Sequence, residues 1–121
     1  MEQEQLKLAQ KIAKILSDKK AQDIVALYVG NLTVITDYMV IASGRSALQV
    51  KALADDVEDA LAEEGIFPRA KEGTGEGRWI VEDYTSVLLH IFHPEDREFY
   101  HLERLWEDGQ NAIELPFVEE E

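Results

Sequence analysis

The chain has two long stretches in which apolar residues recur with the period of an α-helix. In residues 3–18, apolar side chains at i, i+4 and i+7 predict an amphipathic helix. Residues 46–64 follow the same period, with Ser46 and Gln49 matching a capping box and Gly65 as the expected stop. The apolar stripe of this second helix consists of Val50, Leu53, Ala54, Val57 and Leu61.

Shorter apolar runs predict β-strands. These runs cover residues 23–29, 37–42, 69–72, 78–82 and 86–92. Between the third and fourth runs, the glycine-rich segment GTGEG is typical of a mobile hairpin loop.

A third helix is predicted from residue 94 to about residue 108, before Gly109. Pro94 suits the first helical position, and the two acids that follow it suit the positive end of the helix dipole. Along this helix the residues expected in the core are Phe99, Leu102 and either Leu105 or Trp106.

The predicted order of elements is α-β-β-α-β-β-β-α, without internal repeats or a linker. One mixed sheet of about five strands flanked by helices is the natural packing for this order, which defines an α+β fold. We expect a single domain over residues 1–110 and an acidic C-terminal tail over residues 111–121, whose final segment ELPFVEEE is expected to be loose.

Charge is distributed unevenly along the 121 residues. Residues 1–51 carry seven basic and five acidic residues, a net +2, whereas residues 52–121 carry five basic and twenty acidic residues, a net −15. A phosphate backbone is repelled by the second part, so extensive direct nucleic-acid binding is not expected. Such a surface suits a basic protein partner, although acidity also serves solubility alone.

The chain has no cysteine, which excludes disulfides and thiolate metal ligands. The N-terminus resembles that of a mature cytosolic protein, and no apolar run approaches the length of a membrane span. We therefore expect a cytoplasmic protein that does not contact a membrane.

The segment from His90 to Trp106 contains all three histidines of the chain. His90 and His93 are expected to point apart, and no HExxH motif occurs, so no metal site is expected. The turn from Ser43 to Ser46 resembles the Gly-Ser element of nucleotidyltransferases. The paired carboxylates that would hold Mg²⁺ in such an enzyme are missing, so a helix cap is the favoured interpretation and a degenerate nucleotide site the alternative.

Aromatic residues in the second part of the chain point to binding rather than catalysis. Trp79 lies next to the flexible glycines and is either an exposed anchor or a core residue. Phe99 and Trp106 are expected in the core.

Three segments resemble the ribosomal silencing factor family, also called the Iojap family. They are DYMVIASGRSALQVKALADDVEDAL, GRWIVEDY and VLLHIFHPEDREFYHLERLWED, in the order and at the spacing of the family. The resemblance covers about residues 5–110 and implies a nucleotidyltransferase-like mixed fold without known transferase activity.

The resemblance also implies a function. Members bind the large ribosomal subunit through ribosomal protein uL14 and sterically block joining of the small subunit, which represses translation under nutrient limitation. No catalytic residue, cofactor or metal is implied. The sequence leaves open whether the free protein is a monomer or a homodimer.

Matching the family motifs residue by residue implies a partner-binding surface. Trp79 and Ile80 are expected to be apolar anchors, and Asp83 is expected to meet basic groups of the ribosomal protein. The other residues assigned to this surface are Tyr84, Arg97 and Tyr100. The histidines are expected to be a core or hydrogen-bonding residue (His90), a helix-cap neighbour (His93) and a surface residue (His101).

Overall fold

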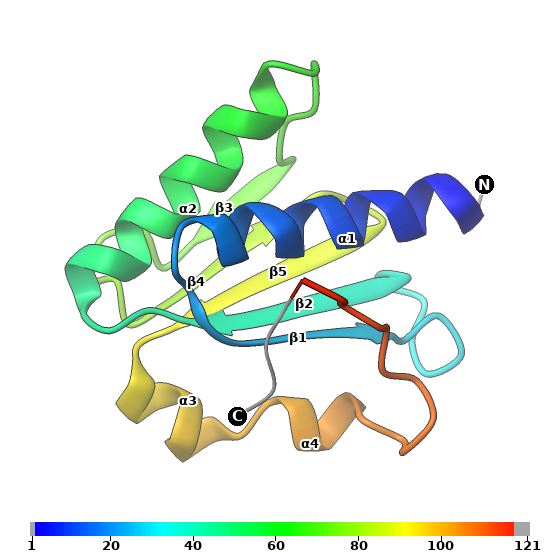
Figure 1. The fold of residues 1–121 in the computed structure, drawn as a ribbon. Helices are drawn as coiled ribbons and strands as arrows, with labels where there is room; N and C mark the ends of the chain where they lie inside the picture. The colour runs from blue at the N-terminus through cyan, green and yellow to red at the C-terminus, as the bar shows by residue number, and fades with distance from the viewer. Residues whose placement is uncertain (1, 118–121) are drawn as a thin grey trace.

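The computed structural model describes residues 2–117, which form one five-stranded mixed sheet with helices on both faces (Figure 1). The elements are α1 (Glu2–Asp18), β1 (Gln22–Tyr28), β2 (Tyr38–Ser43), α2 (Ala47–Ala62), β3 (Ala70–Glu72), β4 (Trp79–Asp83), β5 (Val87–Phe92), α3 (Pro94–Tyr100) and α4 (Glu103–Trp106). The strand order is β1-β2-β5-β4-β3. Only the central pair β2–β5 is parallel, and the other neighbours are antiparallel. The predicted α+β class and the five predicted strands are confirmed.

Helices α1 and α2 cover one face of the sheet, and α3 and α4 lie on the other (Figure 1). Alternation along β5 divides its side chains between the two faces. Val87, Leu89 and Ile91 enter the core under α1 and α2, whereas Leu88 and Phe92 pack on the α4 side with Leu102 and Trp106. His90 lies two residues before Phe92 on the strand, so both rings point toward the face on which α3 and α4 lie.

The ends of α2 follow from local chemistry, as predicted. The Ser46 side chain accepts a hydrogen bond from the backbone N–H of Gln49. The reciprocal bond departs from the predicted capping box, because Gln49 Oε1 accepts from the N–H of Arg45 rather than that of Ser46. At the other end Gly65 has a φ of +77°, a left-handed conformation that favours glycine.

The prediction of one continuous last helix is wrong. The segment breaks into α3 and α4 at His101, whose backbone is left-handed with φ 48° and ψ 47°. The helical spacing that predicted an inward Phe99 and Leu105 does not continue through this residue. Phe99 is 79% exposed and Leu105 is 74% exposed, so their assignment to the core is also wrong. Leu102 and Trp106 do pack against the sheet, as expected.

Residues 111–117 lie along the outer edge of β1, so residues 114–117, which were expected to be loose, are packed against the protein. The Asn111 carbonyl accepts from the N–H of Tyr28, and the N–H of Ile113 donates to the Ala26 carbonyl. These bonds pair the segment with the edge strand around Leu27 and Ala112. The side chains that pack against the core from this segment are Ile113, Leu115 and Phe117. Residues 118–121 of the predicted tail lie outside the described residues.

Candidate partner-binding surface

Trp79 begins β4 on the face of the sheet opposite α1 and α2 and lies among aromatic rings. It pairs in register with Phe92 of β5, so the two side chains stand on neighbouring strands of one face. The ring centroids of Trp79 and Phe92 are 4.8 Å apart in a stacked arrangement, and those of Trp79 and Tyr100 are 4.9 Å apart. Partial burial of Trp79 between β5 and α3 follows from these contacts.

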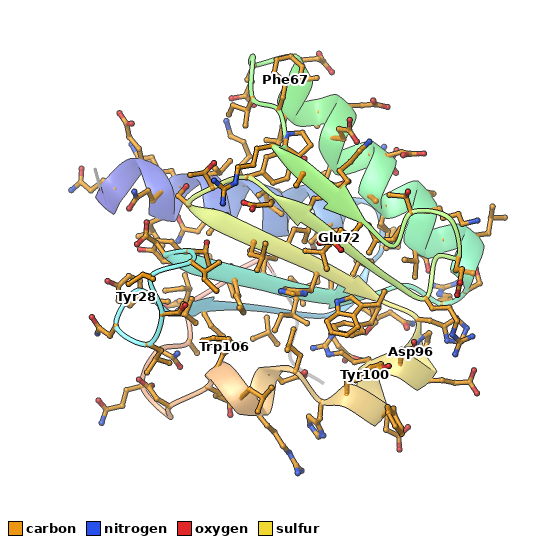
Figure 2. All side chains as sticks on the ribbon, turned by 180° about the vertical axis from the view of Figure 1, so that it is seen from behind. Tyr28, Phe67, Glu72, Asp96, Tyr100 and Trp106 are labelled. Atoms are coloured by element: carbon orange, nitrogen blue, oxygen red, sulfur yellow. The ribbon has the colours of Figure 1, made fainter. Side chains whose placement is uncertain are left out.

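The rings continue outward from the sheet to Tyr100, which ends α3 (Figure 2). Tyr100 contacts Phe99 edge-on, with 5.0 Å between ring centroids. We call Phe92, Trp79, Tyr100 and Phe99 the aromatic row. Exposure rises along it, from 0% at Phe92 to 49% at Tyr100 and 79% at Phe99. The outer part of the row is therefore an apolar surface supported from below by packed rings.

Glycine at position 73 allows the backbone of the β3–β4 hairpin to pass close to the carbonyl of Trp79. Gly73 has a φ of +79°, and a Cβ added there would lie 1.9 Å from the carbonyl oxygen of Trp79. No other residue fits so close to a neighbouring backbone. The glycines predicted to form a flexible loop thus also determine how β4 begins.

Charged groups border the aromatic row next to Trp79. Arg78 precedes Trp79 and donates to Asp96 Oδ1 and Glu95 Oε1 at the start of α3. Hydrogen bonds to Asp96 and then Glu95 raise the pKa of Arg78 above its ordinary value. These ion pairs connect the β3–β4 hairpin to α3, and they place carboxylates beside the aromatic row.

Asp83 ends β4 on the same face as Trp79, four residues further along the strand. Arg69 Nε donates to its Oδ2 at 2.9 Å, and the backbone N–H of Thr85 donates to its Oδ1 at 2.8 Å. The carboxylate is only partly covered, with its side chain 20% exposed. A basic group of a partner reaching Asp83 would compete with Arg69.

Three of the expected surface residues have buried side chains. Ile80 is 1% exposed and packs under α1 and α2, so it points away from Trp79. Tyr84 is 6% exposed, and its hydroxyl donates to Glu82 Oε1. Arg97 is 8% exposed. Of the six expected residues, Trp79, Asp83 and Tyr100 remain accessible in part, and direct contact of the other three with a partner is not supported.

Arg97 holds elements together from inside the protein. Its Nη1 donates to Ser43 Oγ, its Nη2 to the Asp23 carbonyl, and its Nε to the Glu103 carboxylate. One guanidinium thereby connects α3 and α4 to the ends of β1 and β2. The burial of Arg97 is structural, and it fixes the helical segment that carries Tyr100.

Sequence reasoning missed Phe99 as a surface residue, since it was assigned to the core of a continuous helix. The sequence has neither glycine nor asparagine where α3 ends, so no usual stop signal marks the left-handed residue His101. His93, expected beside a cap, is itself the N-cap: its Nδ1 accepts from the N–H of Glu95. The imidazole of buried His90 accepts a hydrogen bond from the indole of Trp79.

The turn from Ser43 to Ser46 is occupied by structural contacts. Ser43 is 3% exposed and accepts from Arg97, and Ser46 caps α2. Among residues 2–117, no group of three or more His, Asp or Glu side chains is placed to hold a metal ion. No helix in the same range is long and apolar enough to cross a membrane.

A second ionisable cluster lies on the opposite face of β4. Glu82 is 1% exposed, and burial raises its pKa to about 7 despite the hydrogen bond from Tyr84. Glu58 and Asp55 of α2 raise it further, and Lys71 of β3 opposes them. This carboxyl lies within the protein, away from the aromatic row.

The fold and this surface describe a small α+β module suited to binding another macromolecule. The family model for the ribosomal silencing factor during starvation matches residues 2–121. A curated relative, ribosomal silencing factor RsfS of Bacillus subtilis, is 40% identical over 100 residues, covering 83% of this chain and 85% of the relative. The chain therefore belongs to the ribosomal silencing factor family.

Solved structures and more distant relatives agree with this assignment. A crystal structure of a protein from Chromobacterium violaceum has a TM-score of 0.76 and 34% identity, covering 89% of this chain and 95% of that one. A mouse protein, "Mitochondrial assembly of ribosomal large subunit protein 1", is 32% identical over 98 residues, covering 78% of this chain and 43% of the mouse protein.

Proposed function

We propose that this protein binds the large ribosomal subunit through ribosomal protein uL14 and sterically blocks joining of the small subunit. Translation is thereby repressed when nutrients are limiting, in the cytoplasm of a bacterium. The observation that carries the proposal is family membership over residues 2–121. The name of the mouse relative, which refers to the ribosomal large subunit, supports the choice of subunit.

The aromatic row supplies a contact surface of the right kind. Aromatic side chains dominate interface hot spots because they bury large areas at a low entropic cost. Tyr100 and Phe99 are exposed, and Trp79 supports them from the sheet. We infer that these three residues are the apolar centre of the contact.

Charge supports a basic protein partner. The net −15 of residues 52–121 favours association with a positively charged protein surface and opposes contact with bare RNA. Asp83 on the same face as Trp79 is the carboxylate that we assign to a basic group of the partner. The proposed mechanism is steric, so it assigns no catalytic step to any residue.

Sedimentation through a sucrose gradient tests the proposal directly. The purified protein is mixed with isolated large subunits, and small subunits are added afterwards. The expected result is that the protein travels with the large subunit and that fewer joined ribosomes form. If the protein stays at the top of the gradient at micromolar concentration, the proposal is wrong.

A variant locates the contact within the protein. Tyr100→Ala is expected to weaken binding to the large subunit roughly tenfold or more, as hot-spot truncations do. The control is Phe67→Ala, which removes an aromatic ring that is 65% exposed and lies after α2, away from Tyr100 (Figure 2). Equal binding by both variants would place the contact elsewhere.

A further inference from the structure

The side chain of Trp79 makes a hydrogen bond in addition to its packing contacts. Its indole Nε1–H donates to Nδ1 of His90 over 3.1 Å. The two residues lie on neighbouring strands, where Val81 of β4 pairs with His90 and Trp79 pairs with Phe92. The indole therefore reaches diagonally across the β4–β5 pair to a side chain of the same face.

The direction of this bond determines the tautomer of His90. An indole nitrogen can only donate, so Nδ1 of His90 must be the unprotonated, accepting nitrogen. The proton of the neutral ring is then on Nε2. That atom is buried and has no hydrogen-bond partner within residues 2–117.

The surroundings of His90 favour this neutral form. His90 is 5% exposed, and burial lowers its pKa to about 4. The groups around it are the aromatic rings of Trp79 and Phe92, at 6.0 and 6.3 Å between centroids. A protonated imidazole would present N–H at both nitrogens and could not accept from the indole.

We propose that His90 is a positioning residue for the partner-binding surface, fixing the indole of Trp79 through its Nδ1 lone pair. The proposal rests on the proposed function for the identity of the partner. Because the only polar atom of the indole is already bound inside the protein, Trp79 offers a partner only carbon atoms. The group that meets Trp79 is therefore one that packs on an aromatic surface, such as a methylene group or a cation, and not a hydrogen-bond acceptor.

The same bond supports the exposed end of the aromatic row. Tyr100 rests on Trp79, and Phe99 rests on Tyr100. A rotation of the indole would remove the support beneath both exposed rings. His90 thus acts on the surface through Trp79 without touching the partner itself.

The tautomer is measured first, on the whole protein without a partner. In ¹⁵N-labelled protein, two-bond proton–nitrogen correlations of the imidazole identify which ring nitrogen carries the proton. We expect Nδ1 of His90 to be unprotonated near neutral pH. A ring protonated on Nδ1 overturns the proposal, whatever the protein binds.

Matched variants then test positioning. His90→Asn keeps an acceptor close to the position of Nδ1, whereas His90→Leu is apolar and keeps none. In a Trp106→Phe background, Trp79 is the only tryptophan of the chain. We expect the indole N–H resonance and the Trp79 fluorescence to shift in His90→Leu and to be restored toward the parent in His90→Asn.

Binding to isolated large subunits supplies the functional readout. His90→Leu is expected to bind about tenfold more weakly than His90→Asn, the size of one buried hydrogen bond. When Trp79 is first changed to Phe, the donor is gone, and the two His90 variants should bind within about twofold of each other. An equal tenfold difference in the Trp79→Phe background would show that His90 acts on packing alone.

The two proposals fail in distinguishable ways. If the parent protein does not bind large subunits, the proposed function is wrong, and the tautomer and indole spectra still decide the role of His90. If the parent binds and His90→Leu binds equally well with an unshifted indole signal, only the positioning role is refuted.

Discussion

Arg97 of α3 and Glu103 of α4 form an ion pair across the break in the last helical segment, with 2.9 Å between Nη2 and Oε2. Both side chains are largely covered, at 10% and 18% exposure. Burial by itself raises the pKa of Glu103, but the hydrogen bonds and charge of Arg97 outweigh it and hold the pKa below its ordinary value. The pair therefore holds the two short helices in the arrangement that exposes Phe99.

Removing Arg97 is expected to destabilise the protein. Arg97→Ala leaves the Glu103 carboxylate and Ser43 without their partner and should lower the free energy of unfolding by about 3 kcal/mol. Urea unfolding followed by circular dichroism measures this. Exposed Arg104→Ala on α4 is the control and should change stability by less than about 0.5 kcal/mol.

Because the pKa of Glu103 is lowered, the contribution of the ion pair to stability is present above the ordinary carboxyl pKa and is lost as pH falls through the folded-state pKa.

Glu82 should make the protein less stable as the pH rises. Its pKa is about 7 in the folded state and near 4.5 when unfolded, so the unfolded chain releases the proton first. The free energy of unfolding is expected to fall between these two values and then level off. Glu82→Gln, which keeps an acceptor for Tyr84, should be more stable than the parent by about 3 kcal/mol at about pH 8 and similar to it at about pH 4. Thermal unfolding at both pH values measures this.

The exposed Glu72 of β3 provides the comparison for Glu82. Glu72→Gln is a surface substitution and should change the free energy of unfolding by less than about 0.5 kcal/mol. If Glu82→Gln shows the same pH profile as the parent, the carboxyl of Glu82 is ionised in the folded protein and the assignment fails.

Phe99 should matter for binding and not for stability. Phe99→Ala removes the outermost ring of the aromatic row and is expected to weaken binding to large subunits by about tenfold, with an unchanged melting temperature. Leu48→Ala on α2 is a matched control, since both side chains are 79% exposed. Loss of stability in Phe99→Ala, or equal loss of binding in Leu48→Ala, contradicts the assigned surface.

Gly65 should be required for its backbone conformation alone. A Cβ added there meets no atom within 4 Å, so Gly65→Ala tests the φ of +77° without a steric clash. We expect a loss of about 1 kcal/mol in the free energy of unfolding. Gly75→Ala also meets no atom within 4 Å, and Gly75 does not have a positive φ. It should be neutral or slightly stabilising, and equal losses at both positions would contradict the explanation.

Much of the architecture could be predicted from local patterns. The stripe from Val50 to Leu61, the serine cap and Gly65 predicted α2 to within two residues at each end. The helical period also predicted α1, and alternating or apolar runs predicted all five strands. These features depend on neighbours only a few residues apart, so the sequence contains them directly.

The candidate site was harder to predict, because accessibility depends on distant contacts. The adjacent residues Trp79 and Ile80 were assigned one role together, yet alternation along β4 places them on opposite faces, and only Trp79 borders the aromatic row. Arg97 was expected at the surface, but its partners lie in β1, β2 and α4. The opposite orientation of the adjacent pair follows from the period of a strand and could have been predicted, whereas the partners of Arg97 are not visible within a short window of sequence.

The sequence by itself determined the elements, the family and the acidic character of the second part of the chain. Only the tertiary structure decided that His101 divides the last helix, that residues 111–117 line β1, and that Trp79 donates to His90. The physical reason is the range of the interactions. Periodicity and capping act over a few residues, whereas Trp79 and His90 are eleven residues apart and meet only because β4 and β5 pair in one particular register.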